Sequence, residues 1–133
     1  MDPVAFLEVA NQLQSSLSEA ERRTAIGRSY YALYNVLRST LENHAVQFAR
    51  NRNSHALLKD YLVNCGHQVA QQLGLTLDTL RLLRNQADYE MHTTINRQQS
   101  QLAYVQARQA VDRFKALTST DMQTIIAAIK AIP

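Results

Sequence analysis

Residues 25–41 read Ala-Ile-Gly-Arg-Ser-Tyr-Tyr-Ala-Leu-Tyr-Asn-Val-Leu-Arg-Ser-Thr-Leu, and this stretch decides the fold. On a helix, where successive side chains are about 100° apart, its large apolar side chains form one stripe and its small side chains a second face. A helix with two packing faces needs partners on both, so we expect it to be the central helix of an all-α protein. The large stripe comprises Ile26, Tyr30, Leu33, Tyr34, Leu37 and Leu41, and the small face comprises Ala25, Ser29, Ala32 and Val36.

The composition of the whole chain favours helices as well. Its 133 residues are 46% hydrophobic and include three glycines and two prolines. Because glycine and proline are the residues that most often interrupt helices, their scarcity predicts long helices with short connections. We therefore expect residues 1–133 to form a single domain, an up-and-down bundle of four or five long helices with short additional ones.

Caps and apolar spacing set the expected helix boundaries. The first helix is expected to start at Pro3 with Asp2 as its N-cap and to reach about residue 14. The second is expected to start near residue 18 and to reach residue 44, because Ser16 and Ser18 are each followed three residues later by glutamate. Later helices are expected at about residues 54–64, 68–73, 76–91 and 97–118, and Thr120 is expected to cap a last one.

Individual residues of the later helices have expected positions too. Gly74 is expected to end the short helix, since glycine is common just after a helix C-terminus. Met91 is expected on the apolar stripe of its helix, and Leu102 is expected in the core. The last helix is apolar enough to favour burial against a second copy of the chain, so a homodimer is expected.

Cysteine and histidine usage argues against a disulfide framework and against a metal site. Cys65 is the single cysteine, and the four scattered histidines lack the spacing of metal ligands. The sequence has neither a leader-peptide pattern nor a long uncharged apolar run. We expect a cytoplasmic protein that uses no cofactor, binds no metal and does not associate with a membrane.

Charge is unevenly distributed along the chain, whose formal net charge is +3. Residues 1–21 contain four acidic side chains and no basic one, whereas residues 22–59 contain seven Arg or Lys and a single acid, Glu42. Within this basic region Arg50, Arg52 and His55 are candidate phosphate contacts, because a polar run there precedes a helix N-terminus. A basic region of this kind is equally typical of a solvated surface.

Residues 82–92 read Leu-Leu-Arg-Asn-Gln-Ala-Asp-Tyr-Glu-Met-His and place an arginine on the apolar side of a helix. A charge there is costly unless it is paired or reaches water, and Asp88 is one turn from Arg84. Arg23 lies close to the direction of Tyr30 on the central helix, in a similar position. The two arginines could converge on one anion, or each could form an ordinary salt bridge.

The two helices together predict a cluster of charged and phenolic side chains. Cleavage of RNA by its own 2′-hydroxyl needs a base, an acid and a cation, and imidazole and guanidinium groups supply these without a metal ion. His92 is about 12 Å from Arg84 along the helix, so the two side chains could share one surface but hardly one phosphate oxygen. His92 could equally be a helix-terminal residue that faces solvent. The cluster comprises Arg23, Tyr30, Tyr31, Arg84, Asn85, Asp88, Tyr89 and His92.

Three segments of the chain resemble one known family. Residues 21–35, Glu-Arg-Arg-Thr-Ala-Ile-Gly-Arg-Ser-Tyr-Tyr-Ala-Leu-Tyr-Asn, are similar to the Ser-Arg-Ala-Tyr-Tyr-Ala helix of HEPN domains, the higher eukaryote and prokaryote nucleotide-binding family. Residues 83–89, Leu-Arg-Asn-Gln-Ala-Asp-Tyr, resemble the Arg-x-x-Ala-Asp-Tyr signature of its small bacterial and archaeal branch. Ser54-His55 matches the Ser-His pair that precedes the next helix in the family.

The resemblance implies a helical bundle that is usually a homodimer. Many members are metal-independent endoribonucleases of toxin-antitoxin or phage-defence systems, often paired with a minimal nucleotidyltransferase. Active members place an arginine and, after four to six residues, a histidine in the dimer cleft. Arg84 and Asn85 match the arginine and its polar neighbour, whereas His92 stands one residue beyond that spacing. Members of this branch commonly lack the histidine, which implies RNA or nucleotide binding, or partnership with the nucleotidyltransferase.

We therefore expect a protein that binds RNA or a nucleotide and that could also cleave RNA. The alternative is a catalytically silent interaction subunit that docks a minimal nucleotidyltransferase. If the protein cleaves RNA, Arg84 is expected to stabilise the phosphorane, His92 or Tyr89 to transfer protons, and Asp88 to orient a partner. The expected binding residues are Arg23, Tyr30, Tyr31, Arg50, Arg52, His55 and Asn85.

Overall fold

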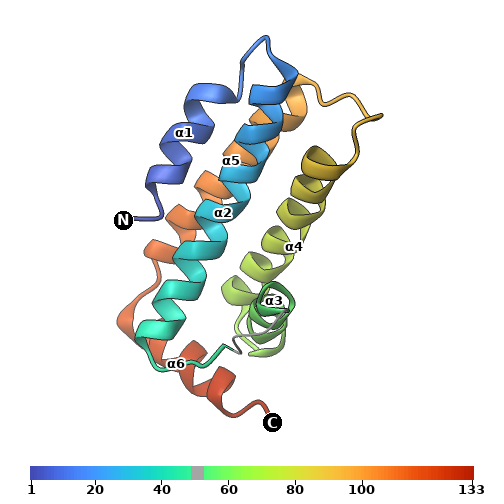
Figure 1. Ribbon diagram of the computed structural model, residues 1–133. Helices are drawn as coiled ribbons and strands as arrows, with labels where there is room; N and C mark the ends of the chain where they lie inside the picture. Colours follow the sequence, from blue (N-terminus) through green and yellow to red (C-terminus); the bar gives the residue numbers. More distant parts are fainter. Residues whose placement is uncertain (49–52) are drawn as a thin grey trace.

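The computed structural model describes residues 1–48 and 53–133, and all regular structure in those ranges is helical (Figure 1). The expected all-α bundle is confirmed. The helices are α1 (Ala5–Leu13), α2 (Glu19–Asn43), α3 (Ser54–Asn64), α4 (Gln68–Tyr89), α5 (Arg97–Lys115) and α6 (Ser119–Lys130).

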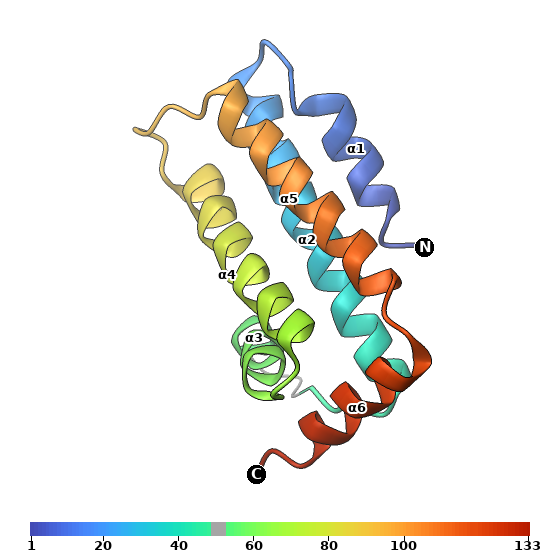
Figure 2. The same cartoon turned by 180° about the vertical axis from the view of Figure 1, so that it is seen from behind.

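Helix α2 is the central helix, as its two faces predict. It packs against α1, α4 and α5, and the two opposite views show α1 and α4 on either side of the α2 and α5 pair (Figures 1 and 2). The large stripe and the small face are both buried, and each large aliphatic side chain removed from water contributes about 1.5–3 kcal/mol to folding. The buried side chains of α2 include Ile26, Tyr30, Leu33, Leu37 and Leu41 on the stripe and Ala25, Ser29, Ala32 and Val36 on the small face.

Helices α2, α4, α5 and α6 are capped by side chains at their N-termini, whereas the N-cap residues of α1 and α3 make no side-chain cap hydrogen bond. The expected cap of the first helix is Asp2, but that helix starts at Ala5, and Asp2 Oδ1 accepts from the Val4 amide at 2.9 Å in the turn before it. Ser18 Oγ accepts a hydrogen bond from the Glu21 amide at 3.3 Å, as expected for α2. The last helix is capped by Thr118 and not by Thr120. Thr118 Oγ1 accepts from the Asp121 amide at 3.0 Å, and the Asp121 carboxylate accepts from the Thr118 amide at 3.2 Å. This reciprocal pair satisfies two free amides at once and sets the start of α6.

The expected helix end at Gly74 is wrong, because α4 is continuous from Gln68 to Tyr89. A Cβ atom at Gly74 would lie 2.9 Å from Val63 Cγ2 and 3.1 Å from Leu62 Cβ. The glycine therefore allows α3 and α4 to pack at close range and does not terminate a helix. His67 caps this helix, since its Nδ1 accepts from the Ala70 amide at 3.4 Å.

Two apolar residues, Leu102 and Met91, lie elsewhere than expected. Leu102 is 53% exposed, because Ala103 and Ala107 carry the buried side of α5. Met91 is 64% exposed, since α4 ends at Tyr89 and the apolar stripe ends with it. Helix α6 contacts α3, and its side chains Ile125, Ile126 and Ile129 are buried within the chain, while the expected homodimer stays a prediction. Within the described ranges no helix is long and apolar enough to cross a membrane.

Candidate functional site

His55 and three tyrosines form an aromatic cluster between α2 and the first turn of α3. The His55 ring stacks on Tyr34, with ring centroids 4.1 Å apart and planes inclined by 17°. The hydroxyl of Tyr30 is hydrogen-bonded to His55 Nδ1. Tyr31 lies edge-on to His55 at 6.3 Å between centroids. The structure thus brings together three of the expected binding residues, Tyr30, Tyr31 and His55, and adds Tyr34, which the sequence pattern places only in the core.

Three arginines surround this cluster. Burial, followed by the positive charges of Arg81, Arg84 and Arg38, lowers the pKa of His55 below its usual value. Arg38 donates a hydrogen bond to Tyr34 Oη at 2.7 Å, and this bond raises the pKa of the arginine. His55 is therefore a neutral imidazole in a positively charged environment.

Arg84 makes the ion pair that its position on the apolar side of α4 requires. Its Nε lies 2.9 Å from Asp88 Oδ2, and its Nη1 donates to Asn85 Oδ1 at 3.1 Å. The Nε group nevertheless makes no well-directed hydrogen bond with the described residues, although it is buried. The guanidinium also lies over the rings of Tyr31 and Tyr89, at 5.3 and 5.6 Å from their centroids. Arg84 is thus held by a carboxylate and two rings, yet stays close to the surface with 20% of its side chain exposed.

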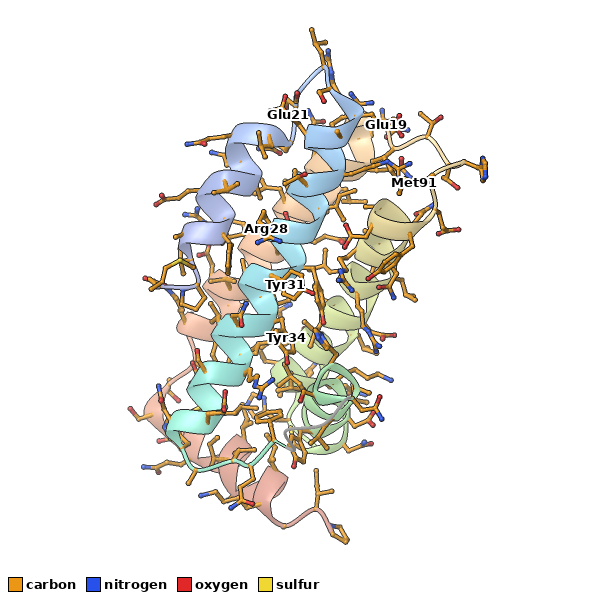
Figure 3. All side chains as sticks on the ribbon, viewed as in Figure 1. Glu19, Glu21, Arg28, Tyr31, Tyr34 and Met91 are labelled. Carbon is orange, nitrogen blue, oxygen red and sulfur yellow. The ribbon has the colours of Figure 1, made fainter. Side chains whose placement is uncertain are left out.

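Rings and guanidinium groups alternate across this side of the molecule. Arg28 lies 5.1 Å from the Phe6 ring and 5.5 Å from the Tyr31 ring. Figure 3 shows Arg28, Tyr31 and Tyr34 following one another along α2, with α4 running alongside. The alternating series spans α1, α2 and α4 and consists of Phe6, Arg28, Tyr31, Arg84 and Tyr89.

Arg23 does not converge on an anion with Arg84. Its Nη1 donates to the Ala87 carbonyl at 2.7 Å, and its Nη2 donates to the Glu90 carbonyl at 3.1 Å and to the Thr93 carbonyl. Glu19 also pairs with this guanidinium at 3.1 Å. Arg23 therefore satisfies the free carbonyls at the C-terminus of α4, and its donors are occupied by that structural role.

The two candidate proton-transfer residues lie in different surroundings. Tyr89, in the last position of α4, is 69% exposed and has its ring beside Arg84. His92 is exposed in the turn that follows, and no contact in the described part of the chain joins it to Arg84. Asp88 forms an ion pair with Arg84, as their spacing of one helical turn predicts. Arg50 and Arg52 lie outside the described residues.

The arginines on this surface could have been found from helical spacing. Arg28 and Arg38 lie three or four residues from Tyr31 and Tyr34, and Arg81 lies one turn before Arg84. Side chains at these spacings share one side of a helix, so they gather around the same rings. In residues 1–48 and 53–133 no group of three or more metal-binding side chains could hold a metal ion. Chemically, the surface offers guanidinium groups to phosphate oxygens and ring faces to bases.

Comparison with known proteins finds a distant relative in an archaeon. An uncharacterized protein of Methanocaldococcus jannaschii is 32% identical to this chain over an alignment 108 residues long, and the match covers 69% of this chain. The similar region spans 65% of that protein, which is less than two thirds of its length. No protein-family model matches the chain. No solved structure matches it.

Proposed function

We propose that this protein binds RNA or a nucleotide through the surface formed by α2, α4 and the first turn of α3. The observation that carries the proposal is the stack of His55 on Tyr34 with Arg38, Arg81 and Arg84 close to it. Guanidinium groups bind phosphate oxygens with charge-assisted hydrogen bonds, and aromatic rings stack with bases. A ligand that carries both a base and a phosphate uses both parts of this surface.

The balance of charge on this surface favours an anionic ligand. Asp88 and Glu42 pair with Arg84 and Arg38, at 2.9 and 3.1 Å. Arg28 and Arg81 form no ion pair with any residue in the described ranges, so two guanidinium charges are left without a carboxylate. Phosphate groups would neutralise them and release counterions, which makes binding weaker as salt concentration rises.

Membership of the HEPN family is part of the proposal. It is supported by the Arg-Asn-Gln-Ala-Asp-Tyr motif at 84–89, whose arginine pairs with the aspartate and lies over the tyrosine ring at the end of α4. It is also supported by Tyr30, Tyr31 and His55, which belong to the other two family-like segments and lie in one cluster. A toxin-antitoxin or phage-defence setting is proposed on the same basis.

Fluorescence anisotropy with a labelled single-stranded RNA of twelve nucleotides tests the binding function. Arg81→Ala is expected to weaken binding on the order of tenfold. It is also expected to reduce the slope of log affinity against log salt concentration by about one, the value for one lost phosphate contact. Arg108→Ala is the matched control, because Arg108 is an exposed arginine on α5 that pairs with Asp112. Competition with AMP distinguishes a preference for RNA from one for a nucleotide. If wild-type protein binds neither RNA nor AMP in low salt, the proposed function is wrong.

Metal-independent cleavage of the bound RNA is a second candidate function. It is favoured by the position of Arg84 between the rings of Tyr31 and Tyr89, where a guanidinium could stabilise a phosphorane beside a phenol. Wild-type protein should cleave RNA in the presence of EDTA, and Arg84→Ala should remain folded and lose this cleavage. Expression of wild type should inhibit cell growth, and expression of Arg84→Ala should not. Equal inertness of wild type and variant would exclude cleavage and leave the binding function.

Docking of a protein partner, such as a minimal nucleotidyltransferase or a second copy, is the remaining candidate. It is favoured by large apolar side chains exposed on two neighbouring helices, Leu75 and Leu82 on α4 and Leu102 and Val105 on α5. Leu82→Lys should weaken complex formation in size-exclusion chromatography with light scattering. If wild type and variant are both monomeric and neither elutes with a co-expressed nucleotidyltransferase, this role is excluded.

A further inference from the structure

We propose, on the basis of the binding function above, that Tyr30 holds His55 in the tautomer whose proton is on Nε2, so that His55 donates a neutral hydrogen bond to a phosphate oxygen. In this assignment Tyr30 is a positioning residue and His55 is a binding residue. His55 does not act as a base, because Nε2 already carries a proton and Nδ1 accepts the hydrogen bond of the Tyr30 hydroxyl.

The buried hydroxyl of Tyr30 determines which nitrogen of His55 carries the proton. Tyr30 has no exposed surface, and burial raises the pKa of its phenol, so the hydroxyl keeps its proton. His55 Nδ1 is the one hydrogen-bond partner that the described residues provide for this hydroxyl. A buried O–H group in a folded protein nearly always has an acceptor. Nδ1 must therefore accept, which leaves the imidazole proton on Nε2.

The ring of His55 is fixed in direction as well as in tautomer. It is stacked on Tyr34 at 4.1 Å, and Tyr34 is itself held by a hydrogen bond from Arg38 at 2.7 Å. With Nδ1 bound to Tyr30 and one ring face covered, Nε2 has a fixed orientation. No residue in the described part of the chain accepts a hydrogen bond from Nε2, so this donor is available to a ligand.

The charges around His55 favour a neutral donor over a protonated one. Arg81 and Arg84 face it from α4 and Arg38 from α2, together with Tyr30, Tyr31 and Tyr34, and Lys59 is one turn further along α3. A second proton would add to this positive charge and would also remove the acceptor of the Tyr30 hydroxyl. A neutral N–H group adds a phosphate contact without either effect. RNA affinity should therefore change little between pH 6.5 and pH 8.

Nitrogen-15 NMR of the imidazole ring tests the tautomer in the ligand-free protein. The proton of His55 is expected on Nε2 in wild type, and Tyr30→Phe is expected to give a mixture of tautomers with the fold unchanged. A wild-type spectrum with the proton on Nδ1, or with both nitrogens protonated at pH 7, would overturn the inference. This measurement does not depend on RNA binding, so it separates the tautomer from the proposed function.

Anisotropy with the twelve-nucleotide RNA tests the role of the Nε2 donor. His55→Gln places an amide N–H near the position of Nε2–H and should bind within about threefold of wild type, whereas His55→Ala should bind on the order of tenfold more weakly. Circular dichroism establishes that both variants are folded. An equal loss of RNA affinity in His55→Gln and His55→Ala would contradict the donor role. A wild-type affinity that falls about tenfold for each pH unit above neutrality would contradict it as well, because it would mean that a protonated imidazole binds the RNA. Absence of wild-type binding would overturn the proposed function and the ligand role of His55 together.

Discussion

Arg84 and Asp88 are joined at 2.9 Å across one turn of α4, yet the same guanidinium lies between the rings of Tyr31 and Tyr89. The carboxylate and a bound phosphate would compete for one cation. Because both side chains are partly exposed, the ion pair contributes about 1 kcal/mol or less to stability. Breaking the pair so that Arg84 can bind a ligand therefore costs little free energy, and the pair is compatible with a role in binding.

Asp88→Asn is expected to tighten RNA binding several-fold at low salt while changing the free energy of unfolding by less than about 1 kcal/mol. The substitution removes a negative charge that competes with phosphate for Arg84. Anisotropy and urea denaturation measure the two effects. Asp112→Asn is the matched control, since Asp112 forms the same kind of pair with Arg108 on α5. Weaker binding by Asp88→Asn would show that the carboxylate supports the site and does not compete with the ligand.

Arg23→Ala is expected to reduce mainly the stability of the fold, whereas Arg28→Ala is expected to reduce mainly the affinity for RNA. Arg23 donates to four carbonyls around the end of α4, and its loss should cost on the order of 2–3 kcal/mol with little effect on RNA affinity in the folded protein. Arg28 contacts the rings of Phe6 and Tyr31, so its loss should cost less than about 1 kcal/mol and weaken RNA binding several-fold. Denaturant unfolding and anisotropy on both variants make the comparison, and equal stabilities would contradict the structural role of Arg23.

The difference between these arginines explains how far the sequence alone could predict the site. Helical spacing places Arg84 beside Asp88 correctly, because both lie on one helix. It cannot show that Arg23 reaches carbonyls more than sixty residues away, since those carbonyls belong to the end of α4 and the turn after it. It also gives Tyr34 a place in the core without showing that its ring supports His55 from another helix.

Gly74→Ala is expected to lower the free energy of unfolding by about 1–3 kcal/mol, although alanine favours helices. The new Cβ would lie 2.9 Å from Val63 Cγ2 and 3.2 Å from the Lys59 carbonyl oxygen. Gly27→Ala is the control, because its Cβ would meet Asp88 Oδ1 at 4.0 Å, an ordinary contact. Chemical denaturation of the two variants gives the comparison. If Gly74→Ala is as stable as wild type, α3 and α4 are not packed as closely as described.

Gly74 also shows which part of the fold the sequence could not predict. Caps and periodicity give the helical class, the central helix and most helix starts, because these depend on neighbouring residues. The close packing at Gly74 depends on Leu62 and Val63 of another helix, so the glycine looks like a helix end when only local sequence is considered. Leu102 is exposed for a related reason, since alanines set the distance at which α5 packs.

Glu19→Gln is expected to remove part of the acid sensitivity of the fold. The Ile95 amide donates to Glu19 at 2.9 Å, and this bond, followed by that from Arg23, lowers the pKa of Glu19 from its ordinary 4.5. A group with a lowered pKa stabilises the folded state above its unfolded pKa, and the contribution is lost as pH falls through the folded value. The difference in melting temperature between wild type and Glu19→Gln should therefore be largest near neutral pH and shrink below about pH 4.5. A difference that stays constant down to pH 3 would contradict this, and Glu8→Gln is the exposed control.

The most direct test of the RNA-binding surface is a titration of isotope-labelled protein with the twelve-nucleotide RNA, followed by NMR. We predict that the largest shift changes fall on Tyr31, Tyr34, His55, Arg81 and Arg84, and that the signals of α6 do not change. Shift changes confined to α5 and α6, or no changes at RNA concentrations well above that of the protein, would contradict the assignment of this surface as the binding site.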